Sequence, residues 1–228
     1  TAIRMDHAVG LNHEDELVAI VSGYHEGQRR PLLPLQCCIS SDNGQTWERH
    51  LLDNHTVPHA DIVALADGRL ACPMYRGISR KPPVNEATVA FSKDGGRSWP
   101  ESTYVGNVNE FHLLPRGNGA WLVVGRTPCH ERMDGVLPHG EGEVLFRSDD
   151  QGKSWSPPRR ISPQGQENAH LLELNDGRVL CSFTSRIPGL FGVVMRVSED
   201  DGASWSLPCV LMSFPAVDWK KTDVGYPS

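Results

Sequence analysis

The chain has 228 residues and a formal net charge of −6 at pH 7, and no stretch approaches the ~20 apolar residues that a membrane-spanning helix needs. This acidic balance argues against a nucleic-acid partner, because phosphate binding favours a basic surface. With 22 Gly and 17 Pro, about one residue in six is a natural turn former. These features predict a soluble all-β protein without a membrane span.

One short phrase occurs four times and organises the whole chain. Its general form is Ser-x-Asp-x-Gly-x-Ser/Thr-Trp, and its copies are Ser40–Trp47, Ser92–Trp99, Ser148–Trp155 and Ser198–Trp205. The copies recur every 50 to 56 residues, which is the length of one four-stranded propeller blade. We therefore predict one β-propeller domain of four-stranded antiparallel blades over residues 1–228. The expected blades are 1–55, 56–106, 107–164 and 165–215, with the start of another at 216–228.

The phrase itself is turn chemistry. Its Asp can accept hydrogen bonds from backbone N–H groups, its Gly supplies a positive φ, and its Trp can cover apolar surface. A calcium loop would need oxygen ligands at alternating positions and a final Glu, which no copy has. Of the six cysteines, Cys72 and Cys181 fall at equivalent places in apolar strands and are expected in the core. Since no Cys-x-x-Cys pair exists, we predict neither a metal site nor a cofactor.

Each repeat has the same internal order of short strands and turns. The first repeat places a strand at Leu17–Val21 after the acidic turn Glu14–Glu16. The second and third repeats have turns at Ala66–Gly68 and Gly117–Gly119. The fourth repeat shows the order most clearly. Its predicted strands are Glu167–Leu174, Arg178–Phe183 and Gly192–Val197, and the turn Asn175–Gly177 lies between the first two.

Counting back from these turns aligns polar residues on the first strand of each repeat. Eight residues before the turn Asp or Asn lie His7, His59, Glu110 and Asn168. Two residues further on lie Val9, Asp61, His112 and His170. The second strands end at Arg76, Arg126 and Arg186. Because the first strands of propeller blades line the central channel, these residues are expected to converge on one rim. The alternative is that they cap strands at a solvated edge.

The repeated phrase resembles the Asp-box of the sialidase (neuraminidase) superfamily. Asn109-Glu110, followed by an apolar strand and Arg126, is similar to the sialidase segment that carries the catalytic Glu and a substrate-binding arginine. Arg186 takes the place of the next arginine, and Tyr226 that of the family's nucleophile. The resemblance implies a six-bladed parent and an exo-glycosidase acting on a sialoside-type sugar, so the chain is expected to be a fragment of a longer polypeptide.

A sialoside-type substrate would explain why arginines, a Tyr and a Glu occur together. Arginines bind a sugar carboxylate through paired hydrogen bonds, and a Tyr nucleophile avoids the repulsion that a carboxylate nucleophile would meet. Glu110 would take the proton of Tyr226. Asp61 is one candidate for the acid that protonates the leaving group. The other candidates lie in the loops 77–87 and 127–143, namely Glu86, Glu131, Asp134, Glu141 and Glu143.

The resemblance is incomplete, since the Phe/Tyr-Arg-Ile-Pro segment that supplies the family's first arginine is absent. His59, His112 and His170 therefore join Arg76, Arg126 and Arg186 as candidate substrate-binding residues. Two alternatives stay open: a propeller-type polysaccharide lyase in which Arg neutralises a uronate while His or Tyr removes a proton, and a non-catalytic carbohydrate-binding propeller. The expected partner is a carbohydrate or glycoconjugate in each case. The compartment, secreted and periplasmic ones included, stays open.

Overall fold

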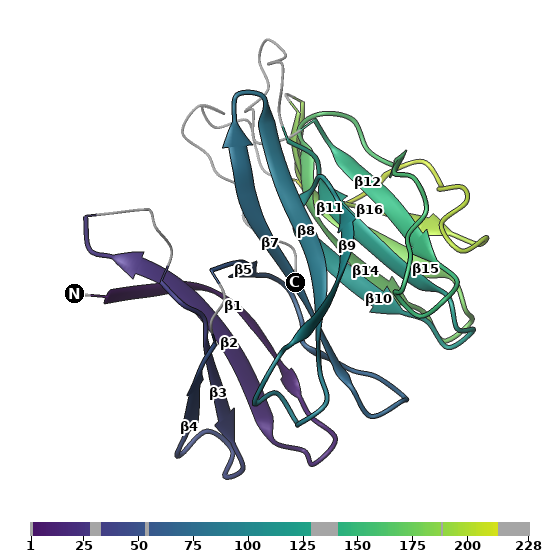
Figure 1. Cartoon of the computed structure of the whole chain (residues 1–228). Helices are drawn as coiled ribbons and strands as arrows, with labels where there is room; N and C mark the ends of the chain where they lie inside the picture. Colours follow the sequence, from purple (N-terminus) through teal and green to yellow (C-terminus); the bar gives the residue numbers. More distant parts are fainter. Residues whose placement is uncertain (1, 28–32, 53–54, 129–140, 188, 214–228) are drawn as a thin grey trace. The chain divides into compact units, whose positions relative to one another are not determined.

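The computed structural model describes residues 2–27, 33–52, 55–128, 141–187 and 189–213. In these ranges every regular element is a β-strand, and none of them contains a helix long and apolar enough to cross a membrane. The strands form four antiparallel sheets, each built from consecutive strands (Figure 1). The chain forms two compact units, residues 1–77 with 86–106 and residues 78–85 with 107–228.

The first two sheets supply the strands of the first unit, except that residues 78–85, at the junction of β7 and β8, are assigned to the second unit. In the first sheet the order is β1 (Ala2–Leu11), β2 (Leu17–His25), β3 (Gln36–Ser40) and β4 (Glu48–Leu51). The second sheet has a divided first strand, β5 (Val57–Pro58) and β6 (Val63–Ala64), and both parts pair with the next strand. The remaining strands are β7 (Leu70–Arg80), β8 (Pro83–Ser92) and β9 (Glu101–Gly106).

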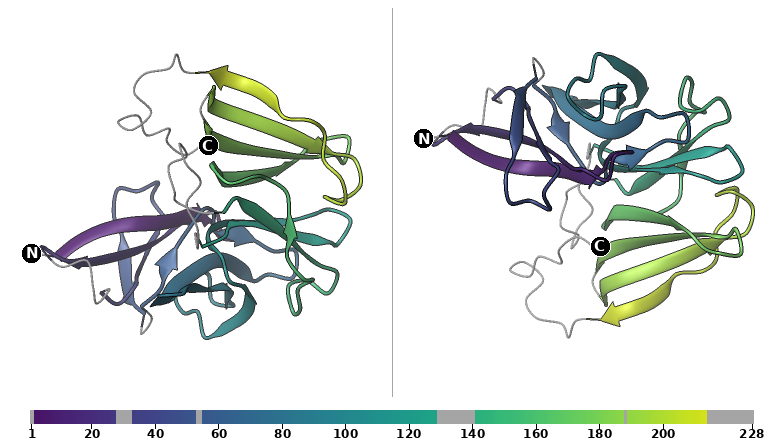
Figure 2. Two further views of the ribbon diagram at one scale, coloured as in Figure 1. Left: turned by 90° about the horizontal axis from the view of Figure 1, so that it is seen from above. Right: turned by 90° about the horizontal axis from the view of Figure 1, so that it is seen from below.

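The third and fourth sheets belong to the second unit. The third consists of β10 (Asn109–Pro115), β11 (Trp121–Arg126), β12 (Glu143–Ser148) and β13 (Arg159–Arg160). The fourth consists of β14 (Gln166–Glu173), β15 (Val179–Ile187), β16 (Leu190–Ser198) and β17 (Cys209–Ser213). Within this unit the first strands of the two sheets, β10 and β14, lie side by side (Figure 2).

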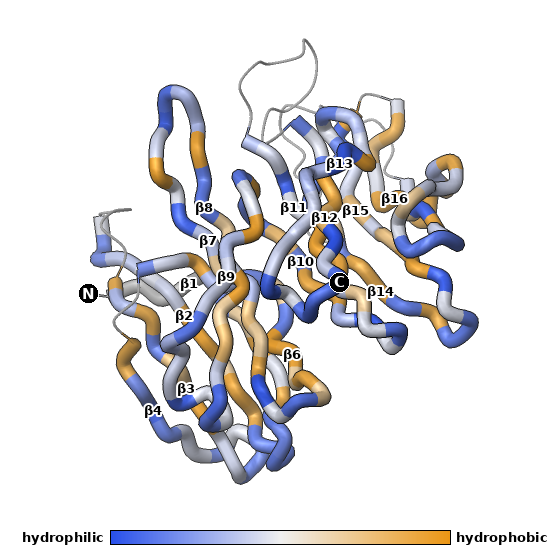
Figure 3. Tube along the Cα trace, turned by 45° about the vertical axis from the view of Figure 1, so that its right-hand side comes forward, coloured by the Kyte–Doolittle hydropathy of each residue, from blue (hydrophilic) through white to orange (hydrophobic). Residues whose placement is uncertain are grey.

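Apolar residues are concentrated in the strands and hydrophilic residues in the turns between them (Figure 3). In the first unit, Ile20, Cys37 and Cys72 are buried in a common apolar cluster. In the second unit, Leu122 and Leu145 of the third sheet pack with side chains of the fourth sheet. Each large apolar side chain buried in this way contributes about 1.5–3 kcal/mol. Cys72 and Cys181 have no accessible surface, which confirms their prediction as core residues.

All four Asp-boxes have the same hydrogen bonds. The Ser hydroxyl donates to Asp Oδ1 at 2.7–2.9 Å and accepts from the Gly amide at 2.7–2.9 Å. The later Ser or Thr donates its hydroxyl to Asp Oδ2 at 2.5–2.6 Å. In the first box this Thr46 hydroxyl lowers the pKa of Asp42 to about 2. The box glycines have φ between 79° and 101°, as the turn requires. The boxes are therefore structural turns.

The strand register corrects the alignment of the first repeat by one residue. Leu11 pairs with Leu17 there, as Pro115 pairs with Trp121 in the third sheet. Asp15, with φ of 59°, takes the place that glycine holds in the other turns. Asp6 and Ala8, rather than His7 and Val9, are thus equivalent to Glu110 and His112. The count was wrong because a non-glycine residue adopts the left-handed conformation.

The glycine of the fourth box offers a test of box packing. An added Cβ at Gly202, where φ is 79°, would lie 2.5 Å from Leu145 Cδ2. At Gly177, where φ is 83°, nothing lies within 4 Å of the same atom. We expect Gly202→Ala to lower the free energy of unfolding by roughly 2–3 kcal/mol and Gly177→Ala by about 1 kcal/mol. Urea denaturation measures both values, and equal losses would show that the contact with Leu145 contributes nothing.

Candidate functional site

A row of polar residues crosses the third sheet where β11 ends. Arg126 pairs with Asn109 of β10 on one side and with Glu143 of β12 on the other. Its Nε donates to Asn109 Oδ1 at 3.0 Å, and its Nη2 donates to Glu110 Oε1 at 2.5 Å. Its Nη1 lies 3.6 Å from Oε2 of Glu167. Arg126 therefore contacts protein oxygens through all three of its nitrogens.

The backbone at the start of β10 and β14 is irregular in the same way. A bulge interrupts the pairing between Asn109 and His112, and another between Glu167 and His170. Within the bulges Glu110 has φ of 44° and Asn168 has φ of 59°. Bulges redirect side chains, and left-handed non-glycine residues are concentrated at functional sites. This shared irregularity lets adjacent residues Asn109 and Glu110 both bind Arg126.

Glu167 connects the third and fourth sheets. Its Oε2 lies 3.3 Å from Nη1 of Arg186 at the end of β15 and 3.6 Å from Nη1 of Arg126. The Glu167 residue has no accessible surface, while Arg126 is 8% and Arg186 4% exposed. One buried carboxylate thus holds two guanidinium groups that come from neighbouring sheets.

Glu143 is a second fully buried carboxyl in this cluster. Its Oε1 accepts a hydrogen bond from the Ala169 amide at 3.3 Å. Burial raises its pKa to about 8, although nearby Arg126 and the Ala169 amide act in the opposite direction. Glu143 is therefore mostly protonated at neutral pH. Because none of its surface is accessible, it is unsuited to the role of an acid that touches substrate.

Two guanidinium groups and the carboxyl groups of Glu110, Glu143 and Glu167 thus lie close together. A guanidinium presents its N–H donors in a fixed planar geometry that matches a carboxylate.

His112 and His170 follow the two bulges at equivalent positions. Their ring centroids lie 3.9 Å apart, with an interplanar angle of 41°. Nδ1 of His112 accepts a hydrogen bond from the Leu171 amide at 3.3 Å. In the neutral ring this assigns the proton of His112 to Nε2, so that nitrogen is a hydrogen-bond donor. The two predicted histidines are thus brought together in the second unit.

Three predicted site residues lie in the first unit. His59 is half-buried and its ring makes an edge contact with Tyr75 at 6.4 Å. Asp61 is exposed and forms an isolated bridge with Val9. Arg76 is exposed and pairs with Glu86 at 2.9 Å. The expectation that β7 ends at Arg76 was wrong, because the hairpin pairing with β8 carries this strand on to Arg80.

The remaining candidates are placed as follows. Tyr226, Glu131 and Asp134 lie outside the described residues. Glu141 pairs with Arg160 of the outer strand β13 at 3.6 Å. Within the second unit the structure therefore brings Glu110, Arg126 and Arg186 into one cluster, and His112 and His170 into contact with each other.

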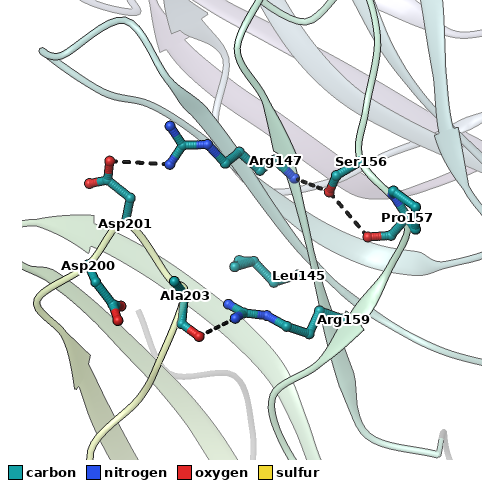
Figure 4. A pocket seen from close by; sticks show the side chains of 8 residues that line it. All are labelled: Leu145, Arg147, Ser156, Pro157, Arg159, Asp200, Asp201 and Ala203. Carbon is teal, nitrogen blue, oxygen red and sulfur yellow. Dashed lines mark hydrogen bonds and ion pairs between the residues drawn. The ribbon is translucent and has the colours of Figure 1, made fainter.

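A separate hollow of about 430 Å³ lies between β12 and the fourth Asp-box (Figure 4). Arg147 and Arg159 enter it from the third sheet, and Asp201 and Ala203 from the box. Arg147 binds Asp201 at 3.2 Å, and Arg159 donates to the Ala203 carbonyl. Because the charged groups bind one another, the hollow is best explained by the packing of the box against the neighbouring sheet.

Sequence reasoning missed the role of Glu167, although a signal was present. The segments Asn109–Leu114 and Glu167–Leu172 share one pattern, Asn-Glu-x-His-Leu-Leu in one and Glu-Asn-x-His-Leu-Leu in the other. This six-residue pattern, whose first two residues are exchanged between the copies, lies at both bulges and contains both histidines.

The sheets and their boxes define the class of the protein by fold: an all-β, sialidase-like propeller with Asp-boxes, as the sequence predicted. The model of the BNR/Asp-box repeat family matches residues 146–157, which include the third box. No curated protein matches the chain.

Several solved structures share this fold. A protein of unknown function from Dyadobacter fermentans is 18% identical with a TM-score of 0.72, over 92% of this chain and 65% of that one. The NanB sialidase of Streptococcus pneumoniae is 14% identical with a TM-score of 0.67, over 92% of this chain and 49% of its own. A GH43_1 enzyme from Xanthomonas citri, complexed with xylose, is 12% identical with a TM-score of 0.61, over 89% of this chain and 72% of that enzyme. The chain thus spans about half the length of the sialidase and about two thirds of the Dyadobacter protein.

Proposed function

We propose that the chain carries part of the site of an exo-acting glycoside hydrolase whose substrate is a terminal acidic sugar of the sialoside type. One observation carries the proposal: Arg126 binds Glu110, and Arg126 and Arg186 share the carboxylate of Glu167, all in the second unit. Guanidinium groups of arginine can bind a planar carboxylate through paired hydrogen bonds. The sialidase and GH43 structures that share the fold add support for a glycosidase.

In this proposal Arg126 and Arg186 bind the sugar carboxylate and so orient the anomeric carbon. Tyr226 attacks that carbon while Glu110 takes the phenolic proton, because an ordinary Tyr with a pKa near ~10 is a weak nucleophile. A separate acid, for which Asp61 is the candidate, gives a proton to the leaving oxygen. Water then attacks the anomeric carbon and gives a proton to the carboxylate of that acid, while the Tyr226 oxygen leaves the sugar and recovers its proton from Glu110.

The nucleophile gives the decisive test. Tyr226→Phe is expected to lower kcat for a fluorogenic sialoside by at least about a thousandfold, because no covalent sugar can form. Tyr104→Phe, at an exposed position on β9, serves as the matched control and should retain full activity. Turnover by Tyr226→Phe at the wild-type rate would remove Tyr226 from the mechanism.

A second candidate is a polysaccharide lyase acting on uronates, and the contact between His112 and His170 favours it. An imidazole beside an arginine-bound carboxylate can remove the adjacent proton. Incubation with polyuronates distinguishes the two enzymes, since a lyase generates an unsaturated product that absorbs in the ultraviolet. Binding of either sugar without turnover would instead identify a carbohydrate-binding propeller.

A further inference from the structure

Ion pairing alone does not explain the position of Glu167. It is the last paired residue before the bulge on β14, it is fully buried, and its Oε2 faces Nη1 of both Arg126 and Arg186 at 3.6 and 3.3 Å. Removing a carboxylate from water costs several kcal/mol, and a packed apolar residue often serves stability as well or better. A fully buried anion shared by two cations thus favours a role in holding their geometry.

A comparison of the bulges in β10 and β14 shows how Glu167 alters the surroundings of Arg126. In β10 the neutral Asn109 stands first and accepts from Nε of Arg126, whereas Glu110 takes the left-handed position. In β14 the order is reversed, with Glu167 first and Asn168 left-handed. Because of this reversal, Arg126 has a carboxylate on each side, Glu110 from its own sheet and Glu167 from the next. If β14 had Asn first and Glu second, as β10 does, no carboxylate would lie between Arg126 and Arg186.

We infer that Glu167 is a positioning residue that orients the guanidinium groups of Arg126 and Arg186 for binding one ligand carboxylate. The inference rests on the proposed function for the identity of that ligand. Glu167 itself does not touch the sugar, since its side chain has no accessible surface. Its effect reaches the substrate only through the two arginines.

The variant Glu167→Gln removes the charge and keeps the shape of the side chain. If the arginines bind the carboxylate equally in the ground state and the transition state, the loss of their orientation should raise KM for a sialoside roughly tenfold or more, with kcat changed less than about threefold. Glu173→Gln is the matched control. Glu173 is also on β14 and also binds a buried arginine, Arg116, at 3.1 Å. It should leave both constants unchanged.

A second readout is independent of turnover. In ¹⁵N-labelled protein, Arg126 and Arg186 are expected to give slowly rotating guanidinium signals that Glu167→Gln broadens or shifts. Glu173→Gln should alter only the signal of Arg116. Unchanged signals of Arg126 and Arg186 in Glu167→Gln would overturn the inference. If that variant does not fold, Glu167→Asp, which keeps the charge but shortens its reach, must disturb the same two signals.

The two readouts separate this inference from the proposed function. A wild-type protein that neither binds nor hydrolyses sialosides would defeat the function, and the arginine signals would still decide the role of Glu167. Conversely, an active wild type whose KM and arginine signals are insensitive to Glu167→Gln would keep the function and defeat the positioning role.

Discussion

The Arg116→Met variant is expected to lose roughly 2–4 kcal/mol of its free energy of unfolding. The Arg116 side chain is 3% exposed and binds Glu173 at 3.1 Å, the Gly177 carbonyl and Asp201. Arg116 lies in the turn after β10, and its side chain binds groups on the fourth sheet and on the Asp-box of that sheet. Removing the cation leaves two carboxylates and a carbonyl without their shared donor. Because Glu173 and Asp201 are 29% and 32% exposed in their side chains, water compensates part of this loss.

The neighbouring Arg178→Met provides the control. Arg178 follows the turn of the fourth sheet and binds Asp176 at 2.8 Å, with both side chains about half exposed. Such surface pairs contribute less than about 1 kcal/mol. Urea denaturation of the two variants measures the difference. Equal and small losses would mean that the turn of β10 adds little to the packing of the third sheet against the fourth.

The Asp-boxes could be predicted from the sequence because their hydrogen bonds are local. The bond from Ser148 to Asp150 and that from Ser154 to the same Asp lie within one eight-residue phrase. Their spacing then gave the number of sheets and the approximate place of each strand. Glu110, Arg126 and Arg186 could be aligned for the same reason, because each sheet repeats its turn at a fixed distance from its first strand.

Other features depend on contacts that spacing does not encode. The pairing of Glu167 with Arg126 joins two sheets, so it follows from packing between blades rather than from the pattern of either one. The length of β7 depends on its hairpin with β8, which carries the strand beyond Arg76. The left-handed Asp15 replaced the glycine that the alignment of the first repeat relied on. Each departure comes from a tertiary contact or a backbone conformation that residue type alone did not indicate.

The protonation of Glu143 predicts a pH dependence of stability. Its pKa is about 8 in the folded protein, against 4.5 as the ordinary value. Between these values the unfolded chain has lost the proton and the folded chain keeps it, so stability falls as the pH rises from about 4.5 to about 8 and then levels off. At about 1.4 kcal/mol per pKa unit, the fall amounts to roughly 3–6 kcal/mol. Below the ordinary pKa both states are protonated and this contribution is fully present.

Glu143→Gln is therefore expected to abolish this fall, because glutamine resembles the neutral acid and does not titrate. Its amide oxygen can still accept from the Ala169 amide, which preserves the one side-chain hydrogen bond that Oε1 makes there. The unfolding free energies of variant and wild type should be similar near pH 5 and differ by roughly 4 kcal/mol near pH 8, in favour of the variant. Glu141→Gln, which also removes one carboxylate but from the pair with Arg160, should follow the wild type. Parallel curves for Glu143→Gln and wild type would show that Glu143 is ionised in the folded protein.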